Sequence, residues 1–217
     1  DSRLAVAFEQ LRYRSYTLQR AVEVACDGRE RLSDARLYVL LDGQNTPEDF
    51  LVLARELVLA GVDVIQLRDK RLDDRAMLDR ARLLREITQG SETLFVMNDR
   101  PDLALLARAD GIHVGQEELP VKEVRSLVGA GTLIGVSVHS IEQARAAVLD
   151  GANYLGVGPT FPSGTKQFDH FPGPELLAAV AAEISLPAFA IGGINRDNVG
   201  QVLAAGIRRI AVSSAVI

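Results

Sequence analysis

The fold is decided by a pattern that residues 140–159 show in full, SIEQARAAVLDGANYLGVGP. Ser140 can cap a helix with the acid Glu142 in its first turn, Gly151 can end that helix, and Tyr154–Pro159 is a largely apolar run typical of a buried strand. The same helix-stopping glycine precedes other apolar runs, in the steps Ala60-Gly61-Val62, Asp110-Gly111-Ile112 and Ala205-Gly206-Ile207. The sequence therefore predicts helices that alternate with strands.

Eight runs follow this rhythm, and their starts lie about 20 to 30 residues apart, which leaves room for one helix in each gap. The predicted strands are Arg36–Asp42, Asp63–Asp69, Thr93–Asp99, Gly111–Gln116, Leu133–Val138, Tyr154–Pro159, Pro187–Gly193 and Arg209–Ala215. Mostly continuous apolar runs suit parallel strands covered on both faces. Eight such units favour an α/β fold, a closed (β/α)8 TIM barrel, over the alternative of an open, doubly wound sheet.

Two regions are predicted, an N-terminal helical extension over residues 1–35 and a TIM-barrel catalytic domain over residues 36–217. Apolar residues recur in the extension at helical spacing, which predicts one long amphipathic helix packed on the barrel or on a neighbouring subunit. These residues are Phe8, Leu11, Leu18, Val22 and Ala25. We expect the last barrel helix to be missing, because the sequence reaches Ile217 directly after the eighth predicted strand.

Composition narrows the function classes. The chain has 217 residues, of which 47% are hydrophobic and 24% charged, as in ordinary globular proteins. Its longest apolar run, Leu176–Ala182, is far too short to cross a membrane. The net charge of −5 gives no field for binding nucleic acid. One cysteine, Cys26, excludes a disulfide framework, so we expect a cytoplasmic protein that acts on small molecules.

Polar residues gather where the predicted strands end, which is where TIM barrels place their active sites. Gly193, followed about twenty residues later by Ser213 and Ser214, resembles the usual barrel phosphate site, since glycines let the backbone approach an anion. The alternative is that the glycines form a tight turn and the serines cap a missing helix.

A second anion site is predicted across the barrel mouth. Arg68 and Lys70 lie two residues apart on an extended segment and so point to the same face, where Lys166 can join them. Three cations around one cavity would suit a pyrophosphate group. The alternative is that Arg68 and Lys70 are solvated or paired with nearby acids, namely Asp69, Asp73 and Asp74.

Asp99 and Glu118 follow consecutive strands and would be neighbours at the same mouth. Carboxylates beside a phosphate-binding cavity are the ligands that Mg²⁺ requires, so both residues are candidate metal ligands. Alternatively, Asp99 caps the helix that begins at Pro101, and Glu118 is a surface residue. His139 also ends a strand and could bind substrate, move a proton or be structural. His113, inside a strand, is interpreted as packing against the barrel wall.

At these residues the sequence resembles the thiamine phosphate synthase (thiamine-phosphate pyrophosphorylase) family, over essentially the whole predicted barrel. The matching stretches are Gln66–Lys70, Asn98–Arg100, Asp110–Glu117, Ile134–Ser137, Gly156–Pro159 through Thr165-Lys166, and Gly192–Ile194. The resemblance implies an Mg²⁺-dependent transferase of thiamine biosynthesis. Such an enzyme joins hydroxymethylpyrimidine diphosphate to hydroxyethylthiazole phosphate and releases pyrophosphate.

The resemblance also implies roles for individual residues. Gln66, Arg68, Lys70, Asn98, Ser137 and Lys166 would hold the pyrimidine diphosphate, with Arg68, Lys70, Lys166 and Ser137 in catalytic roles. Asp99 and Glu118 would bind Mg²⁺, and Ser163, Thr165, Gly193, Ser213 and Ser214 would hold the thiazole phosphate. His139 could contact substrate. The family commonly has Asp where this chain has Glu118, and often Thr where it has Ser163.

Two other functions stay open from the sequence. A thiazole tautomerase of the same barrel family would use His139 to move a proton, but it needs no diphosphate site and so leaves Arg68, Lys70 and Asp99 unexplained. A non-catalytic phosphate-ligand-binding barrel would be expected to lack some of the site residues. A homo-oligomer is possible for any of the three.

Overall fold

The computed structural model describes residues 8, 10–11, 14–15, 27–162 and 171–213. Its strands form one closed, parallel barrel in chain order, with β8 paired to β1, which confirms the predicted TIM barrel. Every predicted strand is present, β5 with the predicted bounds and the others with narrower ones. The strands are β1 (Leu37–Leu41), β2 (Val64–Leu67), β3 (Leu94–Asn98), β4 (Gly111–Val114), β5 (Leu133–Val138), β6 (Tyr154–Val157), β7 (Ala188–Ile191) and β8 (Ile210–Val212).

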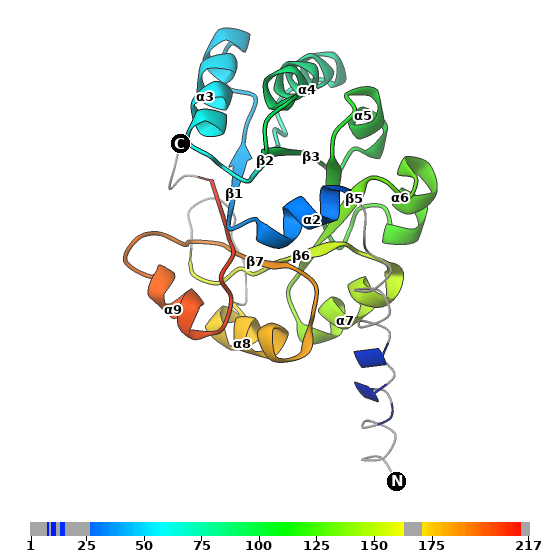
Figure 1. Cartoon of the computed structure of the whole chain (residues 1–217), viewed down its shortest axis with the longest axis vertical. Coiled ribbons are helices and arrows are strands. Elements are labelled where there is room, and N and C mark those ends of the chain that lie inside the picture. The colour runs from blue at the N-terminus through cyan, green and yellow to red at the C-terminus, as the bar shows by residue number, and fades with distance from the viewer. Residues whose placement is uncertain (1–7, 9, 12–13, 16–26, 163–170, 214–217) are drawn as a thin grey trace.

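The described helices comprise α2, which precedes β1, and seven that surround the barrel, one after each of the strands β1 to β7 (Figure 1). They are α2 (Asp27–Asp34), α3 (Pro47–Leu59), α4 (Asp74–Thr88), α5 (Pro101–Leu106), α6 (Val121–Val128), α7 (Ile141–Asp150), α8 (Gly173–Glu183) and α9 (Val199–Ala204). The Ser140 cap is confirmed, because its side chain accepts a hydrogen bond from the Gln143 amide, and Gly151 ends α7 in the left-handed conformation. None of the described helices is long and apolar enough to span a bilayer.

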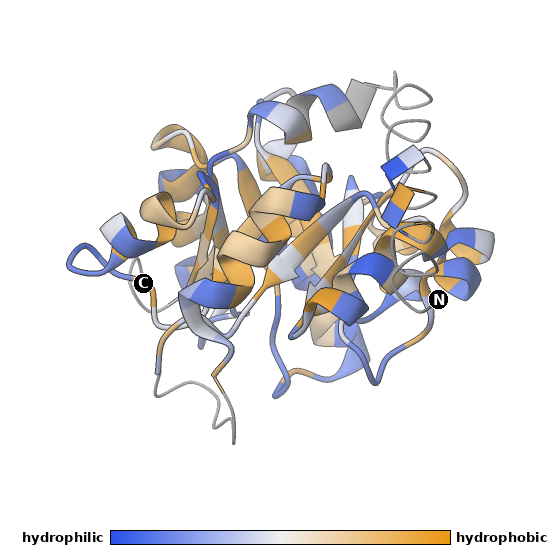
Figure 2. Cartoon of the chain, turned by 90° about the horizontal axis from the view of Figure 1, so that it is seen from below, coloured by the Kyte–Doolittle hydropathy of each residue, from blue (hydrophilic) through white to orange (hydrophobic). Residues whose placement is uncertain are grey.

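Hydrophobic side chains form two layers, one inside the barrel and one between the barrel and its helices. Tyr38, Tyr154 and Phe189 fill the interior together with smaller aliphatic residues. The outer layer contains Phe50 of α3 and Leu177 of α8, among others. Figure 2 shows hydrophobic colouring in the strands and on parts of the surrounding helices. Burial on both faces explains why these strands read as continuous apolar runs.

Helix α2 closes the amino-terminal end of the barrel (Figure 1). Leu32 and Ala35 are each 1% exposed and belong to the inner core layer. Of the long helix predicted over 1–35, the structure describes α2 and a few helical positions, among them Phe8 and Leu11, whose side chains are exposed. Leu18, Val22 and Ala25 lie outside the described residues, so the single long helix stays a prediction, as does the division into two regions.

At the amino-terminal end of the barrel, the same kind of side-chain-to-backbone hydrogen bond links successive pairs of strands. Asp63, Asp110 and Asn153 each precede an even-numbered strand and accept a backbone N–H of the preceding odd-numbered strand. Arg209 stands in the corresponding place before β8, and its guanidinium donates to the Ser33 carbonyl of α2. Three strand pairs, β1–β2, β3–β4 and β5–β6, are therefore linked by side-chain oxygens, whereas the residue before β8 is hydrogen-bonded to α2.

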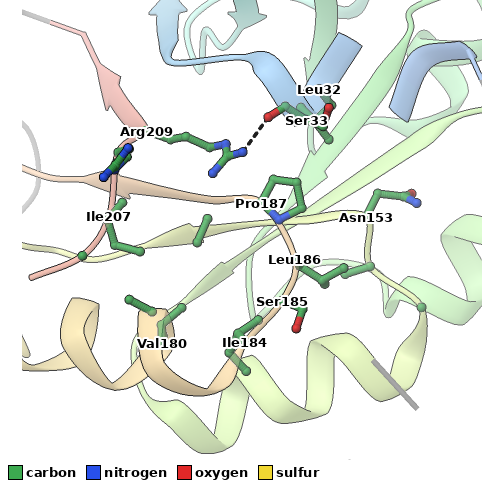
Figure 3. A pocket seen from close by; sticks show the side chains of 16 residues that line it. Leu32, Ser33, Asn153, Val180, Ile184, Ser185, Leu186, Pro187, Ile207 and Arg209 are labelled. Atoms are coloured by element: carbon green, nitrogen blue, oxygen red, sulfur yellow. Dashed lines mark hydrogen bonds between the residues drawn. The ribbon is translucent and has the colours of Figure 1, made fainter. Parts of the chain in front are cut away.

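A cavity of about 430 Å³ opens beside Arg209, between α8 and the starts of β6 to β8. Figure 3 shows Val180, Ile184 and Ile207 on its apolar side, with Arg209 directed to Ser33. This cavity lies at the end of the barrel opposite to the polar strand ends. It is lined mainly by apolar side chains and two arginines, without a carboxylate. We therefore place the candidate site at the other end of the barrel.

Candidate active site

The carboxyl ends of the strands bring most of the predicted residues to one rim. Arg68 follows β2, Asn98 ends β3, Ser137 lies in β5 and Ser213 follows β8. Because the strands are parallel, these positions share one end of the barrel. The predicted contributions of Ser163, Thr165, Lys166 and Ser214 fall outside the described residues, as does the predicted absence of a helix after β8.

The acids that could have neutralised Arg68 and Lys70 are engaged elsewhere. Asp73 caps α4 by accepting the Ala76 amide, and Asp74 pairs with Arg100. Asp69 pairs with Arg71. Within the described ranges, neither Arg68 nor Lys70 forms an ion pair within 4.0 Å. The structure thus contradicts the alternative in which these two cations are paired with the acids beside them.

Asp69 holds the loop after β2 in place. Its side chain is 1% exposed and accepts hydrogen bonds from Arg71 and from the Gly43 amide at the end of β1. Burial acts to raise its pKa, but the hydrogen bonds from Arg71 and Gly43 outweigh burial and lower the pKa to about 2. The clamp fixes the segment that carries Arg68 and Lys70.

Asp99 adopts an unusual conformation at the end of β3. Its φ angle is 59°, in the left-handed region that non-glycine residues rarely occupy, and its amide donates to the His113 carbonyl of β4. Asn98 donates a hydrogen bond of 2.6 Å to the Asp99 carboxylate. Arg100, rather than Asp99, precedes α5, and no side chain caps that helix. The helix-cap alternative for Asp99 is therefore wrong, and the strained backbone marks this position as a functional candidate.

Charges of both signs converge on Asp99. Burial and the nearby carboxylate of Glu118 raise its pKa above the ordinary value, while the hydrogen bond from Asn98 and the charges of Lys70 and Arg68 act in the opposite direction. Arg68, Lys70 and Glu118 therefore lie close enough to Asp99 to influence the pKa of its carboxyl group. All four residues follow or end neighbouring strands, β2 to β4, at the same end of the barrel.

The donor set of Asp99 and Glu118 fits a divalent cation. Glu118 folds over Gly115, where a Cβ atom would collide with its carboxylate. Two neighbouring carboxylates repel each other, and a cation between them would relieve that repulsion. Mg²⁺ commonly uses one or two carboxylates and completes its shell with water and phosphate oxygens. Among the described residues no group of three or more such ligands occurs, so a metal here would depend on other oxygens.

A line of polar side chains, buried at Gln66, Tyr38 and Tyr154 and half-buried at His113 and Ser137, crosses the barrel interior just below the rim. The Gln66 amide donates to the Tyr38 hydroxyl at 2.8 Å, and the Tyr38 and Tyr154 hydroxyls are 3.1 Å apart. His113 contacts the Tyr154 hydroxyl through Nδ1 at 3.3 Å and the Ser137 hydroxyl through Nε2 at 2.9 Å. Burial and the charge of Arg68 lower the pKa of His113 to about 4, which keeps the ring neutral.

The interpretation of His113 as a residue that only packs against the barrel wall is wrong, because its ring is hydrogen-bonded to Ser137. Tyr38 and Tyr154 are not among the predicted site residues. A tyrosine inside an apolar strand is the signal that could have found them, because a buried hydroxyl needs a partner.

His139 lies beside the line without joining it. Its Nδ1 is 2.5 Å from the Gly158 carbonyl, and its amide donates to the Gln143 side chain. Gln116 donates to the Ser137 carbonyl and ties the loop after β4 to β5. His139 therefore sits at the end of β5 against the start of the loop after β6.

Gly192 and Gly193 form a tight corner directly after β7. Both glycines have positive φ angles, 99° and 62°, and a Cβ at Gly193 would lie 2.5 Å from the Pro162 carbonyl oxygen. The helix does not begin directly after them, because Asn195 accepts the amides of Asp197 and Asn198 in an intervening turn, and α9 begins at Val199. A turn, rather than the end of a helix, therefore follows the two glycines.

The comparisons agree with this geometry. The sequence model described as thiamine monophosphate synthase (TMP-TENI) matches residues 37–216, which is the whole barrel. The chain belongs to the thiamine monophosphate synthase family. It is 47% identical over 99% of its length to the thiamine-phosphate synthase of Rhodopirellula baltica, and 45% identical over 98% of its length to that of Gloeobacter violaceus. It spans 60% and 61% of those two relatives.

A solved member of the thiamine monophosphate synthase family shares the fold. The thiamine phosphate pyrophosphorylase from Pyrococcus furiosus superposes with a TM-score of 0.75 at 36% identity, over 87% of this chain and 89% of that one. The resemblance stated from the sequence motifs is therefore confirmed, whereas the individual site residues stay predictions.

Proposed function

We propose that this chain is a thiamine phosphate synthase, a transferase that joins hydroxymethylpyrimidine diphosphate to hydroxyethylthiazole phosphate and releases pyrophosphate. The proximity of Arg68, Lys70 and Glu118 to the Asp99 carboxylate carries the proposal. A diphosphate needs cations that are not already neutralised, and these two form no ion pair within the described ranges. The names of the curated relatives support the same reaction.

In the proposed reaction, the bond between the pyrimidine methylene carbon and the diphosphate oxygen breaks, and the electron pair leaves with the oxygen. The thiazole nitrogen lone pair then forms the new carbon–nitrogen bond. That nitrogen carries no proton, so the reaction needs no strong general base. Arg68 and Lys70 would stabilise the negative charge that develops on the leaving group, and the barrel rim would align the two substrates.

Asp99 and Glu118 would hold Mg²⁺ beside the diphosphate. When bound there, the ion would supply further neutralisation of the leaving pyrophosphate. Asn98 would orient the Asp99 carboxylate through the hydrogen bond that it donates. Gly193 and Ser213, on the opposite part of the rim, would bind the thiazole phosphate, together with Ser214, Ser163 and Thr165.

The purified protein should be incubated with both substrates, with and without Mg²⁺, and thiamine phosphate detected by its fluorescence after oxidation. We expect product only when both substrates are present, and more of it with Mg²⁺. Absence of product with both substrates and Mg²⁺ would contradict the proposal. Rearrangement of a thiazole monophosphate without consumption of the diphosphate would instead indicate a tautomerase.

A further inference from the structure

The line from Gln66 to Ser137 contains a fixed order of donors and acceptors. Gln66 and Tyr38 are each 2% exposed and Tyr154 is fully buried, so their polar atoms depend on one another. A tyrosine hydroxyl has one proton, and the side-chain nitrogen of glutamine can only donate. The positions of all the protons along the line can therefore be counted from its Gln66 end.

The count begins at Tyr38. Its oxygen accepts from the Gln66 amide, so its single proton points to the Tyr154 oxygen. Tyr154 is fully buried, and its other hydrogen-bond partner among the described residues is Nδ1 of His113, so its own proton points to that nitrogen. Nδ1 must be the unprotonated nitrogen. The ring proton of neutral His113 then lies on Nε2 and is donated to the Ser137 hydroxyl.

We propose that His113 is a positioning residue, held in its Nε2–H tautomer by Tyr154 and Tyr38, and that it makes Ser137 direct its own hydroxyl proton toward the barrel mouth. Ser137 accepts from His113, which leaves its single proton for another partner. The substrate atom that meets Ser137 is therefore a hydrogen-bond acceptor, such as a pyrimidine ring nitrogen or a phosphate oxygen. This last clause rests on the proposed function, whereas the order of protons does not.

Glycines in the neighbouring strands make room for this arrangement. A Cβ atom at Gly135 in β5 would collide with the Tyr154 ring and lie 2.5 Å from His113 Nδ1. At Gly156 in β6, a Cβ would lie 3.1 Å from Cε1 of His113. The absence of a side chain at these two glycines therefore leaves the space in which Tyr154 and His113 make contact.

The tautomer can be read directly by ¹⁵N NMR of the histidine rings at about pH 8, above the ordinary histidine pKa of about 6.5. We expect His113 to show a protonated Nε2 and an unprotonated Nδ1. His139 serves as an internal control for which we expect the opposite tautomer, with the proton on Nδ1. Its Nδ1 contacts the Gly158 carbonyl, which can only accept a hydrogen bond. Signals would be assigned with His139→Gln and His170→Gln, which each remove one of the other two histidines of the chain.

Tyr154→Phe is the decisive variant, because it removes one hydroxyl and keeps the ring. The His113 signals should move toward a mixture of tautomers, while those of His139 stay in place. With a misdirected Ser137 hydroxyl, kcat/KM for the pyrimidine diphosphate should fall about tenfold, the equivalent of one hydrogen bond or about 1.4 kcal/mol. Gly131→Ala, at an exposed glycine with no atom within 4 Å of the new Cβ, should match the wild type in both measurements.

A protonated Nδ1 on His113 in the wild type would overturn the proposal, since it would mean that the line runs in the reverse order. An unchanged tautomer in Tyr154→Phe would also overturn it. The predicted tautomer shift with an unchanged kcat/KM would refute the positioning role of His113. A wild-type protein that shows the predicted tautomer but makes no thiamine phosphate would refute the proposed function alone, because the NMR measurement needs no substrate.

Discussion

Asp69 is bound by Arg71, two residues further along the chain, and not by its direct neighbours Arg68 and Lys70. Arg71 contacts this carboxylate through its guanidinium at 2.9 Å and through its amide at 2.7 Å. The acid is therefore neutralised by an exposed cation, and its buried side chain anchors the loop. Arg68 and Lys70 form no ion pair within the described ranges, as their proposed role at the barrel mouth requires.

The Asp69 clamp predicts a loss of stability in acid. Its pKa is lowered from the ordinary 3.8 to about 2, so its contribution is fully present above about pH 4 and is lost as the pH falls toward 2. Asp69→Asn should flatten the dependence of the unfolding free energy on pH in that window, measured by urea unfolding. Asp79→Asn, at an exposed acid of α4, serves as the control. Equal slopes for wild type and Asp69→Asn would contradict the clamp.

Removing the cations should weaken the diphosphate site. Charge-assisted hydrogen bonds are worth about 1.5–3 kcal/mol each, so Arg68→Met and Lys70→Met should each lower kcat/KM by roughly ten- to one-hundredfold. Arg75→Met, at an exposed arginine in the first turn of α4, should retain the wild-type rate. Steady-state kinetics with the pyrimidine diphosphate varied would check this. An unaffected Arg68→Met enzyme would remove that residue from the site.

Variants of two adjacent acids distinguish the loss of a metal ligand from the loss of a surface charge. Glu118 is half-buried and lies near Asp99, whereas Glu117 is exposed. Glu118→Gln should raise the Mg²⁺ concentration needed for half-maximal activity, because one carboxylate ligand is lost. Glu117→Gln should leave that concentration unchanged. If both variants gave the wild-type Mg²⁺ titration, Glu118 would not be a ligand.

Two glycines of the β7–α9 region should respond in opposite ways to alanine. Gly193 has a φ angle of 62° and its Cβ would press on the Pro162 carbonyl, so Gly193→Ala should destabilise the corner and raise KM for the thiazole phosphate. Gly200 lies in α9 with open space around it, and Gly200→Ala should stabilise the protein by about 0.5–1 kcal/mol. Thermal unfolding and substrate titration measure both effects. A Gly193→Ala variant with wild-type KM would contradict the phosphate corner.

The barrel was predictable from the sequence because each strand is buried on both faces and each helix carries its own end signals. Ser140 and Gly151 are examples, since local hydrogen bonding and backbone freedom define both ends of α7. The start of α9 was not predictable in the same way. Asn195 can cap a helix or close a turn, and here it closes a turn that delays the helix to Val199.

The buried part of the candidate site was harder to predict. Asp99 and Glu118 could be read from their places after consecutive strands, since the topology brings strand ends together. Tyr38 and Tyr154 could not, because their hydroxyls meet across the barrel from β1 and β6, 116 residues apart. Which strand positions face the interior depends on the barrel's register, and a single sequence does not reveal that register.

The claim that this rim joins a diphosphate substrate to a thiazole phosphate is tested most directly by ³¹P NMR of one reaction mixture. We predict that the signals of both substrates fall together and that one pyrophosphate appears for each thiamine phosphate, with no change when either substrate is omitted. Release of pyrophosphate without the thiazole phosphate, or no change with both substrates and Mg²⁺ present, would contradict it.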